Sequence, residues 1–192
     1  MRVRGSRLGW LLICSLSAAL GPACSVPREV HEPVAYPDTK ISASSLVLEV
    51  IDARSGATPT SGQQLLLPQD FEATAQGRLA RMPSGQGPAL TVNTLVSAAD
   101  VSELVDARGE MTRVAVTLDF EVKVQGGPLL RRAQTQSHSD LRREEATPEE
   151  VNFLLNTTAL DAFDRYWADP KTSAALNSDL AAYGKAKPKQ NE

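Results

Sequence analysis

The chain has few of the residues that usually mark a dedicated chemical site. Its 192 residues include only two Cys and two His, and aromatic side chains make up 5% of the composition. So few Cys exclude a miniprotein held together by several disulfides. The sequence also has no P-loop, no dinucleotide-binding glycine pattern, no HExxH and no CxxC motif. We therefore expect no bound metal and no cofactor.

The chain also has no large excess of either positive or negative charge. The chain has 20 Lys and Arg against 23 Asp and Glu, which gives a formal net charge of -3. A nucleic-acid binder would show a basic excess, so no nucleic-acid partner is expected. An apolar content of 42% is too high for a fully disordered chain, and a charged content of 22% is too high for a polytopic membrane protein. The length predicts one domain with a short tail at each end.

The apolar run near the start is too short to be a membrane span. Residues 8–20 carry no charge and follow a positive start that contains Arg2, Arg4 and Arg7. A helix of this length covers about 20 Å, whereas the hydrocarbon core of a bilayer is ~30 Å thick. A charged start with a short apolar run is typical of a secretory signal peptide. We predict that residues 1–23 are a signal peptide.

Cys24 stands where a bacterial lipoprotein is acylated. The sequence Leu20-Gly21-Pro22-Ala23-Cys24 resembles a lipobox, although Leu20 lies four residues before the Cys and not the usual three. Ordinary signal cleavage nearby, which would leave Cys24 as a plain thiol, is the alternative. Cys14 is lost with the leader in either case, so Cys24 has no partner for a disulfide, and a lone exported thiol is prone to oxidation. We predict that Cys24 is lipidated and that its acyl chains hold the protein at a membrane.

The residues after Cys24 predict a tether on the periplasmic side. Ser25 resembles the outer-membrane signal in the sorting rule of enteric lipoproteins, which favours the outer membrane over the inner one. Removal of the leader takes away three Arg and no acidic residue, so the formal net charge changes from -3 to -6. Residues 24–43 contain three Pro with scattered charges and predict an extended tether. His31 in this segment has no second ligand at metal-binding spacing and is interpreted as a solvated residue.

The remaining sequence predicts one domain over residues 44–183 and a polar tail over residues 184–192. Apolar and polar residues alternate strictly over residues 114–124, which predicts a strand with one buried face and one exposed face. Thr147-Pro148-Glu149-Glu150 is a capping box, and apolar residues then recur at helical spacing. The other predicted strands cover residues 45–52, 90–98 and 129–139, and the other predicted helices cover residues 67–82 and 171–183.

This order predicts an α+β fold. It is a two-layer sandwich in which an antiparallel-rich sheet of about four strands, in the order β-α-β-β-β-α, carries two helices on one face. The returning strand at residues 129–139 is more polar than its neighbours and is expected at an edge of the sheet.

Three groups of residues could have a catalytic or binding role, but each also has a simpler structural interpretation. Ser137-His138-Ser139-Asp140 resembles a hydrolase triad, but adjacent strand residues point to opposite faces. Asp119 and Glu121 could form an acid–base pair, but on an exposed strand face with Lys123 they are expected to be solvated. Tyr166 and Trp167 could form a binding platform, but their helical spacing places them in the core. We expect no catalytic residue and no enzyme activity.

The element order resembles a set of small bacterial envelope lipoproteins. The features that carry the resemblance are Cys24, the strand at residues 113–118 with its Gly126-Gly127 hairpin, and the capped helix from Pro148. They are similar to the YajG-like lipoproteins, the LPS-assembly lipoproteins and the auxiliary lipoproteins of ABC-type lipid transport systems. The resemblance implies a non-enzymatic accessory or docking subunit of an envelope transport or assembly complex, with an envelope protein as its partner. The alternative is a module that binds a lipid or glycan in an apolar cavity between sheet and helices.

Overall fold

A computed structural model describes residue 36 and residues 39–53, 68–82, 85–107, 109–142 and 146–186. The predicted signal peptide, Cys24, Ser25, His31 and most of the predicted tether lie outside the described residues. Residues 187–192 of the predicted tail also lie outside them.

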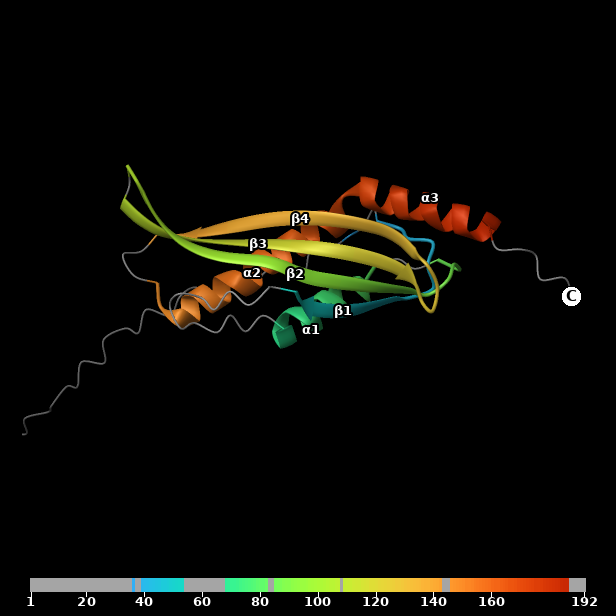
Figure 1. The fold of residues 1–192 in the computed structure, drawn as a ribbon, viewed down its shortest axis with the longest axis horizontal. Helices are drawn as coiled ribbons and strands as arrows, with labels where there is room; N and C mark the ends of the chain where they lie inside the picture. The colour runs from blue at the N-terminus through green and yellow to red at the C-terminus, as the bar shows by residue number, and fades with distance from the viewer. Residues whose placement is uncertain are drawn as a thin grey trace, which may run out of the picture. The chain divides into compact units, whose positions relative to one another are not determined.

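The described part of the chain forms a four-stranded sheet with helices packed on it (Figure 1). Neighbouring strands follow the order of the sequence, with β1 parallel to β2 and the other two pairs antiparallel. The α+β prediction is confirmed, and the helix predicted at residues 171–183 is present as a third helix, Pro170–Ala186. The elements are β1 (Leu46–Asp52), α1 (Pro68–Leu79), β2 (Leu90–Asp106), β3 (Gly109–Val124), β4 (Leu129–Leu141), α2 (Pro148–Ala168) and α3 (Pro170–Ala186).

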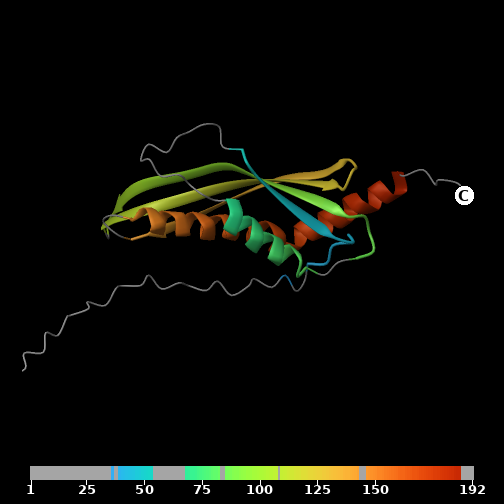
Figure 2. The ribbon, with the colours of Figure 1, turned by 90° about the horizontal axis from the view of Figure 1, so that it is seen from below.

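The alternation in β3 decides which face of the sheet is covered. Val114, Val116, Leu118, Phe120 and Val122 are each buried, whereas the residues between them are only half-buried. Figure 2 shows α1 and α2 below the sheet, on one face of it. The opposite face of the sheet carries none of the described helices.

Aromatic side chains fill the space between sheet and helices. The Phe120 ring of β3 stacks on the Tyr166 ring of α2, with centroids 4.3 Å apart and planes 10° apart. Phe71 of α1 meets Phe163 of α2 edge to face at 6.0 Å. Each such pair contributes about 0.5–1.5 kcal/mol beyond the apolar area that it buries. Trp167 is completely buried in the same cluster, so the prediction that Tyr166 and Trp167 belong to the core is confirmed.

The predicted capping box begins α2. The Thr147 backbone N–H donates to Glu150 Oε2 at 2.9 Å, and the Glu150 N–H donates to Thr147 Oγ1 at 3.3 Å. Pro148 occupies the first turn, where no intrahelical donor is needed. A helix that begins in this way presents its apolar stripe to the sheet from the first turn.

The end of the predicted tether belongs to the folded domain. Tyr36, Ile41 and Ala43 are buried members of the hydrophobic core, so the folded part of the chain begins earlier than residue 44. Backbone contact with residues 85–87 fixes this segment: Gly85 N–H donates to the Ala43 carbonyl at 2.7 Å. A Cβ atom on Gly87 would lie 1.7 Å from the Ser42 carbonyl oxygen. Only glycine therefore fits at position 87.

A buried ion pair connects this segment to α1 and α2. Arg78 of α1 pairs with Asp164 of α2, and the Tyr36 hydroxyl donates to the second oxygen of the same carboxylate. All three residues are buried. Burial, reinforced by the hydrogen bond to Asp164, raises the pKa of Tyr36 far above its usual range. The Asp164 carboxylate thus has a partner on each oxygen, which a buried charge requires.

Candidate functional site: the outer face and the free edge of the sheet

One face of the sheet carries none of the described helices (Figure 2). We call it the outer face. Alternation along the strands places two kinds of residue there, an apolar group on β1 and β2 and a polar group on β3 and β4. Its residues are Val47, Glu49 and Ile51 of β1, Asn93 and Leu95 of β2, Asp119, Glu121 and Lys123 of β3, and Arg132, Gln134, Gln136 and His138 of β4.

Ion pairs cross the polar half of the outer face from strand to strand. Glu121 accepts from Lys123 Nζ at 2.8 Å and from Arg132 of β4 at 2.9 Å. The hydrogen bond from Lys123 is the main reason why the pKa of Glu121 lies below its usual range. Asp119 accepts from the Gln134 amide at 2.7 Å. Both carboxylates that could have formed an acid–base pair are therefore bound by neighbouring side chains.

The polar contacts continue towards β1. The Asn93 amide lies 3.1 Å from Glu49 Oε2 and 3.1 Å from Lys123 Nζ, and it satisfies both when its nitrogen faces Glu49. Glu49, Asn93, Lys123, Glu121 and Arg132 thus form a continuous chain of polar contacts across all four strands. The charged groups in this row alternate in sign.

On β1, two exposed apolar residues of the outer face lie on either side of Glu49. Val47 and Ile51 are 42% and 43% exposed, although both are β-branched residues in a regular strand. Leu95 of β2 lies opposite Ile51 and is half-buried. These exposed apolar side chains lie beside the row of polar contacts. Protein interfaces also combine apolar residues with a border of polar groups.

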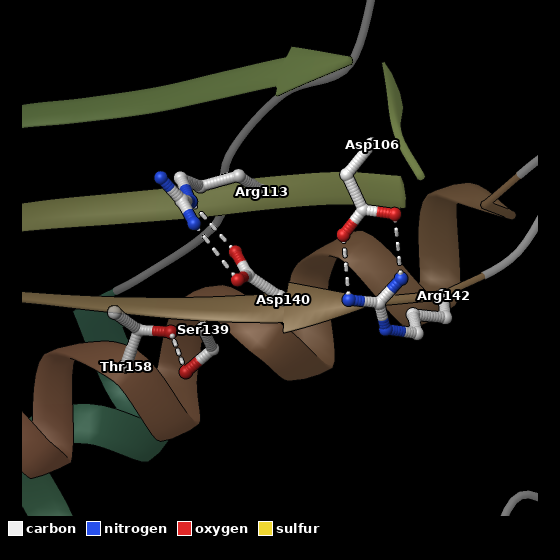
Figure 3. Close-up of polar contacts among 6 residues, drawn as sticks. All are labelled: Asp106, Arg113, Ser139, Asp140, Arg142 and Thr158. Atoms are coloured by element: carbon white, nitrogen blue, oxygen red, sulfur yellow. Dashed lines mark hydrogen bonds and ion pairs between the residues drawn. The ribbon is translucent and has the colours of Figure 1, made fainter. Parts of the chain in front are cut away.

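Two further ion pairs hold the far end of the sheet together (Figure 3). Arg113 of β3 binds both oxygens of Asp140 of β4, at 2.7 and 2.9 Å, and this bond lowers the pKa of Asp140. Arg142 binds both oxygens of Asp106 at 3.1 and 2.8 Å, and this bond raises the pKa of Arg142. Because β3 lies between β2 and β4, the Arg142 side chain connects two strands that are not neighbours. Sequence reasoning missed both pairs, since nothing local to these residues indicates their partners.

The inner side of β4 is tied to α2 by hydroxyl groups. The Thr158 hydroxyl donates to Ser139 Oγ at 2.8 Å (Figure 3). Thr135 donates to the Ala162 carbonyl at 2.9 Å, and Ser137 donates to the Asp161 carboxylate. These bonds compensate for the shortage of apolar side chains in β4 and fix the strand on the helix layer.

The two edges of the sheet differ in how their backbone groups are satisfied. On the β1 edge, the Gln76 side chain of α1 accepts from Leu48 N–H at 2.8 Å and donates to the Leu46 carbonyl at 3.3 Å. This amide takes the place of a further strand. On β4, the predicted edge strand, no described residue outside β3 bonds to the backbone. Residues 133–139 of β4, Ala-Gln-Thr-Gln-Ser-His-Ser, carry none of the Lys, Pro or acidic residues that protect exposed edges.

The residues that resembled a hydrolase triad are not brought together. Ser137 is buried against α2, whereas His138 points to the outer face and is exposed. Asp140 binds Arg113 with both of its oxygens. His138 and Asp140 therefore share the outer face, whereas Ser137 faces the opposite side of β4, against α2.

A small cavity lies beside the start of β1, away from the centre of the core. Its volume is about 230 Å³, which is below the usual range for a small-molecule site. The space between the sheet and α2 is filled by the aromatic cluster described above. Within the described ranges, no group of three or more His, Cys, Asp or Glu could hold a metal ion, and no helix is long and apolar enough to cross a membrane. The cavity is lined by Ile41, Ala43, Ser44, Ser45, Leu46, Gln76, Leu79, Ala80 and Met82.

No protein-family model and no curated protein matches the sequence. Among solved structures, the chain is similar to a minor lipoprotein from Acinetobacter baumannii, with 12% identity, a TM-score of 0.44, and coverage of 64% of this chain and 87% of that one. It is also similar to a protein from Caulobacter crescentus described as a lipoprotein (14% identity, TM-score 0.35, 75% and 93% coverage). A third similar structure is a homologue of a neuraminyllactose-binding hemagglutinin from Helicobacter pylori (10% identity, TM-score 0.41, 80% and 94% coverage). Two of these three similar structures are thus of bacterial lipoproteins, and no residue role is transferred from them.

Proposed function

We propose that this protein is a lipid-anchored docking subunit of the bacterial envelope, held at a membrane by acyl chains on Cys24. Its folded domain binds a partner protein of an envelope transport or assembly complex through the outer face. The partner presents apolar side chains to Val47 and Ile51 and charged or amide groups to the polar half. The outer membrane, on its periplasmic side, is the proposed location.

The observation that best supports the docking role is that apolar side chains of β1 lie exposed beside charged side chains that are already bound to one another in ion pairs. A charged surface whose side chains are fixed loses little conformational entropy when a partner binds. Apolar side chains such as Val47 and Ile51 gain from burial, at roughly 25 cal/mol per Å² of apolar surface removed from water. A solvent-exposed sheet face that binds no partner is expected to carry polar residues along its whole width.

We propose further that the protein is not an enzyme. Glu121 on the outer face is paired with Lys123 and Arg132, and the Ser137 hydroxyl is directed into the helix layer. A catalytic acid, base or nucleophile would instead need a free functional group in a cleft that can hold a substrate.

Site-directed crosslinking tests the docking face. A Val47→Cys variant is labelled with a thiol-reactive photo-crosslinker in intact cell envelopes and irradiated. The matched control is Ala174→Cys, which is exposed on α3 in the helix layer. We expect one dominant protein adduct with Val47→Cys and none with Ala174→Cys. Equal patterns from both positions, or only free monomer, would refute the docking role of the outer face.

The anchor has a separate test. The intact mass of the mature protein should equal that of a chain beginning at Cys24 plus a diacylglyceryl group and a further acyl chain. A Cys24→Ala variant should lose this mass and leave the membrane fraction. An unmodified mature N-terminus in the wild-type protein would refute the anchor while leaving the crosslinking result intact.

A further inference from the structure

The edge of β4 is free to pair with a further strand, whereas the edge of β1 is not. The Gln76 amide occupies the β1 edge, so that edge cannot accept another strand without losing two hydrogen bonds. The β4 edge has no such cover among the described residues. An uncharged stretch of seven residues, 133–139, runs along it. An edge of this kind is a template for strand addition.

The sequence of β4 is complementary to itself in one antiparallel register. Arg132 and Asp140 stand at equal distances on either side of Gln136. If a second β4 runs antiparallel with Gln136 opposite its own copy, each Arg132 lies opposite an Asp140 of the other chain. Residues directly opposite in an antiparallel pair have Cβ atoms about 4.5–5.5 Å apart, so the two charges are within reach of each other.

The charges at both ends are on the correct face for this pairing. Arg132 and Asp140 both belong to the outer side of β4, since they pair with Glu121 and Arg113 of β3. The Arg132 side chain is 71% exposed even though it contacts Glu121. The new contacts would therefore extend an existing row, from Glu121 through Arg132 to Asp140 and Arg113 of the second copy, in which opposite charges alternate.

In this register the two copies of α3 lie far apart along the joined strands. α3 contacts β4 near one end, where Arg131 binds Asp179 at 2.8 Å. The two-fold axis through Gln136 places the second α3 near the other end. Ten residues separate the two Arg131 positions along the strand direction, or about 33 Å at ~3.3 Å per residue, so the two α3 helices do not meet at the axis.

We propose that two copies of this protein join through β4, antiparallel about Gln136, to form one continuous sheet. The symmetry is that of an isologous dimer, in which each Arg132 binds Asp140 of the other copy. The outer faces of both copies then lie on the same side of the joined sheet. The inference does not depend on the docking role of the outer face or on the anchor.

Disulfide crosslinking of membrane-embedded full-length protein tests the register. A Gln136→Cys variant places its two thiols on the two-fold axis, and the exposed Gln136 side chain makes no hydrogen bond to another described residue. The matched control is Thr117→Cys, because Thr117 lies directly opposite Gln136 on β3, one strand further from the edge. The wild-type chain controls for Cys24. Because a disulfide needs Cβ atoms within about 4.5 Å, we expect about tenfold more covalent dimer from Gln136→Cys than from Thr117→Cys.

A charge exchange separates intermolecular pairing from intrachain effects. Arg132→Asp or Asp140→Arg, each in the Gln136→Cys background, should reduce the crosslinked dimer several-fold, whereas the double exchange should restore it. Within one chain the double exchange only adds repulsion, between Asp and Glu121 and between Arg and Arg113, so recovery can come only from the second copy. Three results would overturn the proposal: equal crosslinking at both Cys positions, no recovery in the double exchange, or an adduct of Gln136→Cys with a different protein.

Discussion

The hydroxyl group of Tyr36 offers the sharpest test of how the N-terminal segment is held. Tyr36→Phe removes one O–H donor and leaves the ring, so the packing of the buried ring stays nearly unchanged. The lost bond ends on Asp164, a buried carboxylate whose other oxygen is bound by Arg78. A hydrogen bond to a charged group is worth about 1.5–3 kcal/mol. At about 2 kcal/mol, the melting temperature of a chain of this size should fall by roughly 4–8 °C.

Tyr166→Phe is the matched control for this experiment. Tyr166 is also buried, but its hydroxyl has no hydrogen-bond partner among the described residues. Its removal should change the free energy of unfolding by less than about 0.5 kcal/mol, or stabilise the fold, because an unpaired buried hydroxyl carries a desolvation penalty. Both variants lose the same atom, so the difference between them isolates the bond to Asp164.

The assay is equilibrium urea unfolding of the purified full-length protein in detergent, followed by tryptophan fluorescence. Arg78→Met sets the upper limit, since it leaves the Asp164 charge buried without a cation and should cost about 3–5 kcal/mol. If Tyr36→Phe and Tyr166→Phe unfold at the same urea concentration, then the Tyr36 bond does not hold the segment and the reasoning fails.

Three further predictions concern the backbone, the sheet edge and high pH. Gly77→Ala should stabilise the protein by about 0.5–1 kcal/mol, because alanine favours a helix and a Cβ there meets no atom within 4 Å. Gly87→Ala should prevent stable folding, which thermal unfolding will show. Gln76→Leu should cost about 1–2 kcal/mol and promote aggregation, measured by light scattering, because it uncovers the β1 edge. The two buried tyrosines, Tyr36 and Tyr166, should leave stability unchanged from neutral pH up to about pH 10, where unfolded tyrosine ionises, and stability should fall above it. Burial raises the pKa of Tyr166 to about 12, and that of Tyr36 is raised further, so the folded state keeps both protons.

Each of these has an outcome that contradicts it. A destabilised Gly77→Ala variant would mean that α1 is not an exposed regular helix at that position. Wild-type stability in Gly87→Ala would contradict the close approach of residue 42. A soluble, fully stable Gln76→Leu variant would show that the amide does not protect the edge. Tyrosinate absorbance that develops completely before unfolding would contradict the burial of Tyr36 and Tyr166.

Local patterns in the sequence were sufficient to predict most of the elements. The alternation over residues 114–124 identified β3 and its buried face, since strand side chains alternate between faces. The capping box at Thr147 fixed where α2 begins, because it satisfies backbone donors within four residues of one another. Tyr166 and Trp167 were placed in the core by helical spacing alone. These features depend on neighbours in the chain, and that is why they are readable from it.

Contacts between distant residues could be decided only by the tertiary structure. Tyr36 and Asp164 are 128 positions apart, and Gln76 reaches the edge of β1 from 28 positions away. A periodic pattern reports that a residue is buried, but it does not report which distant group will meet it there. The Pro-spaced segment before residue 44 therefore reads as a tether, whereas its last residues fold into the core because a buried ion pair on two helices offers Tyr36 a bond. The sequence alone determined the layers, the exposed face of β3 and the edge position of β4, whereas long-range packing determined which distant groups cover the β1 edge and hold the N-terminal segment.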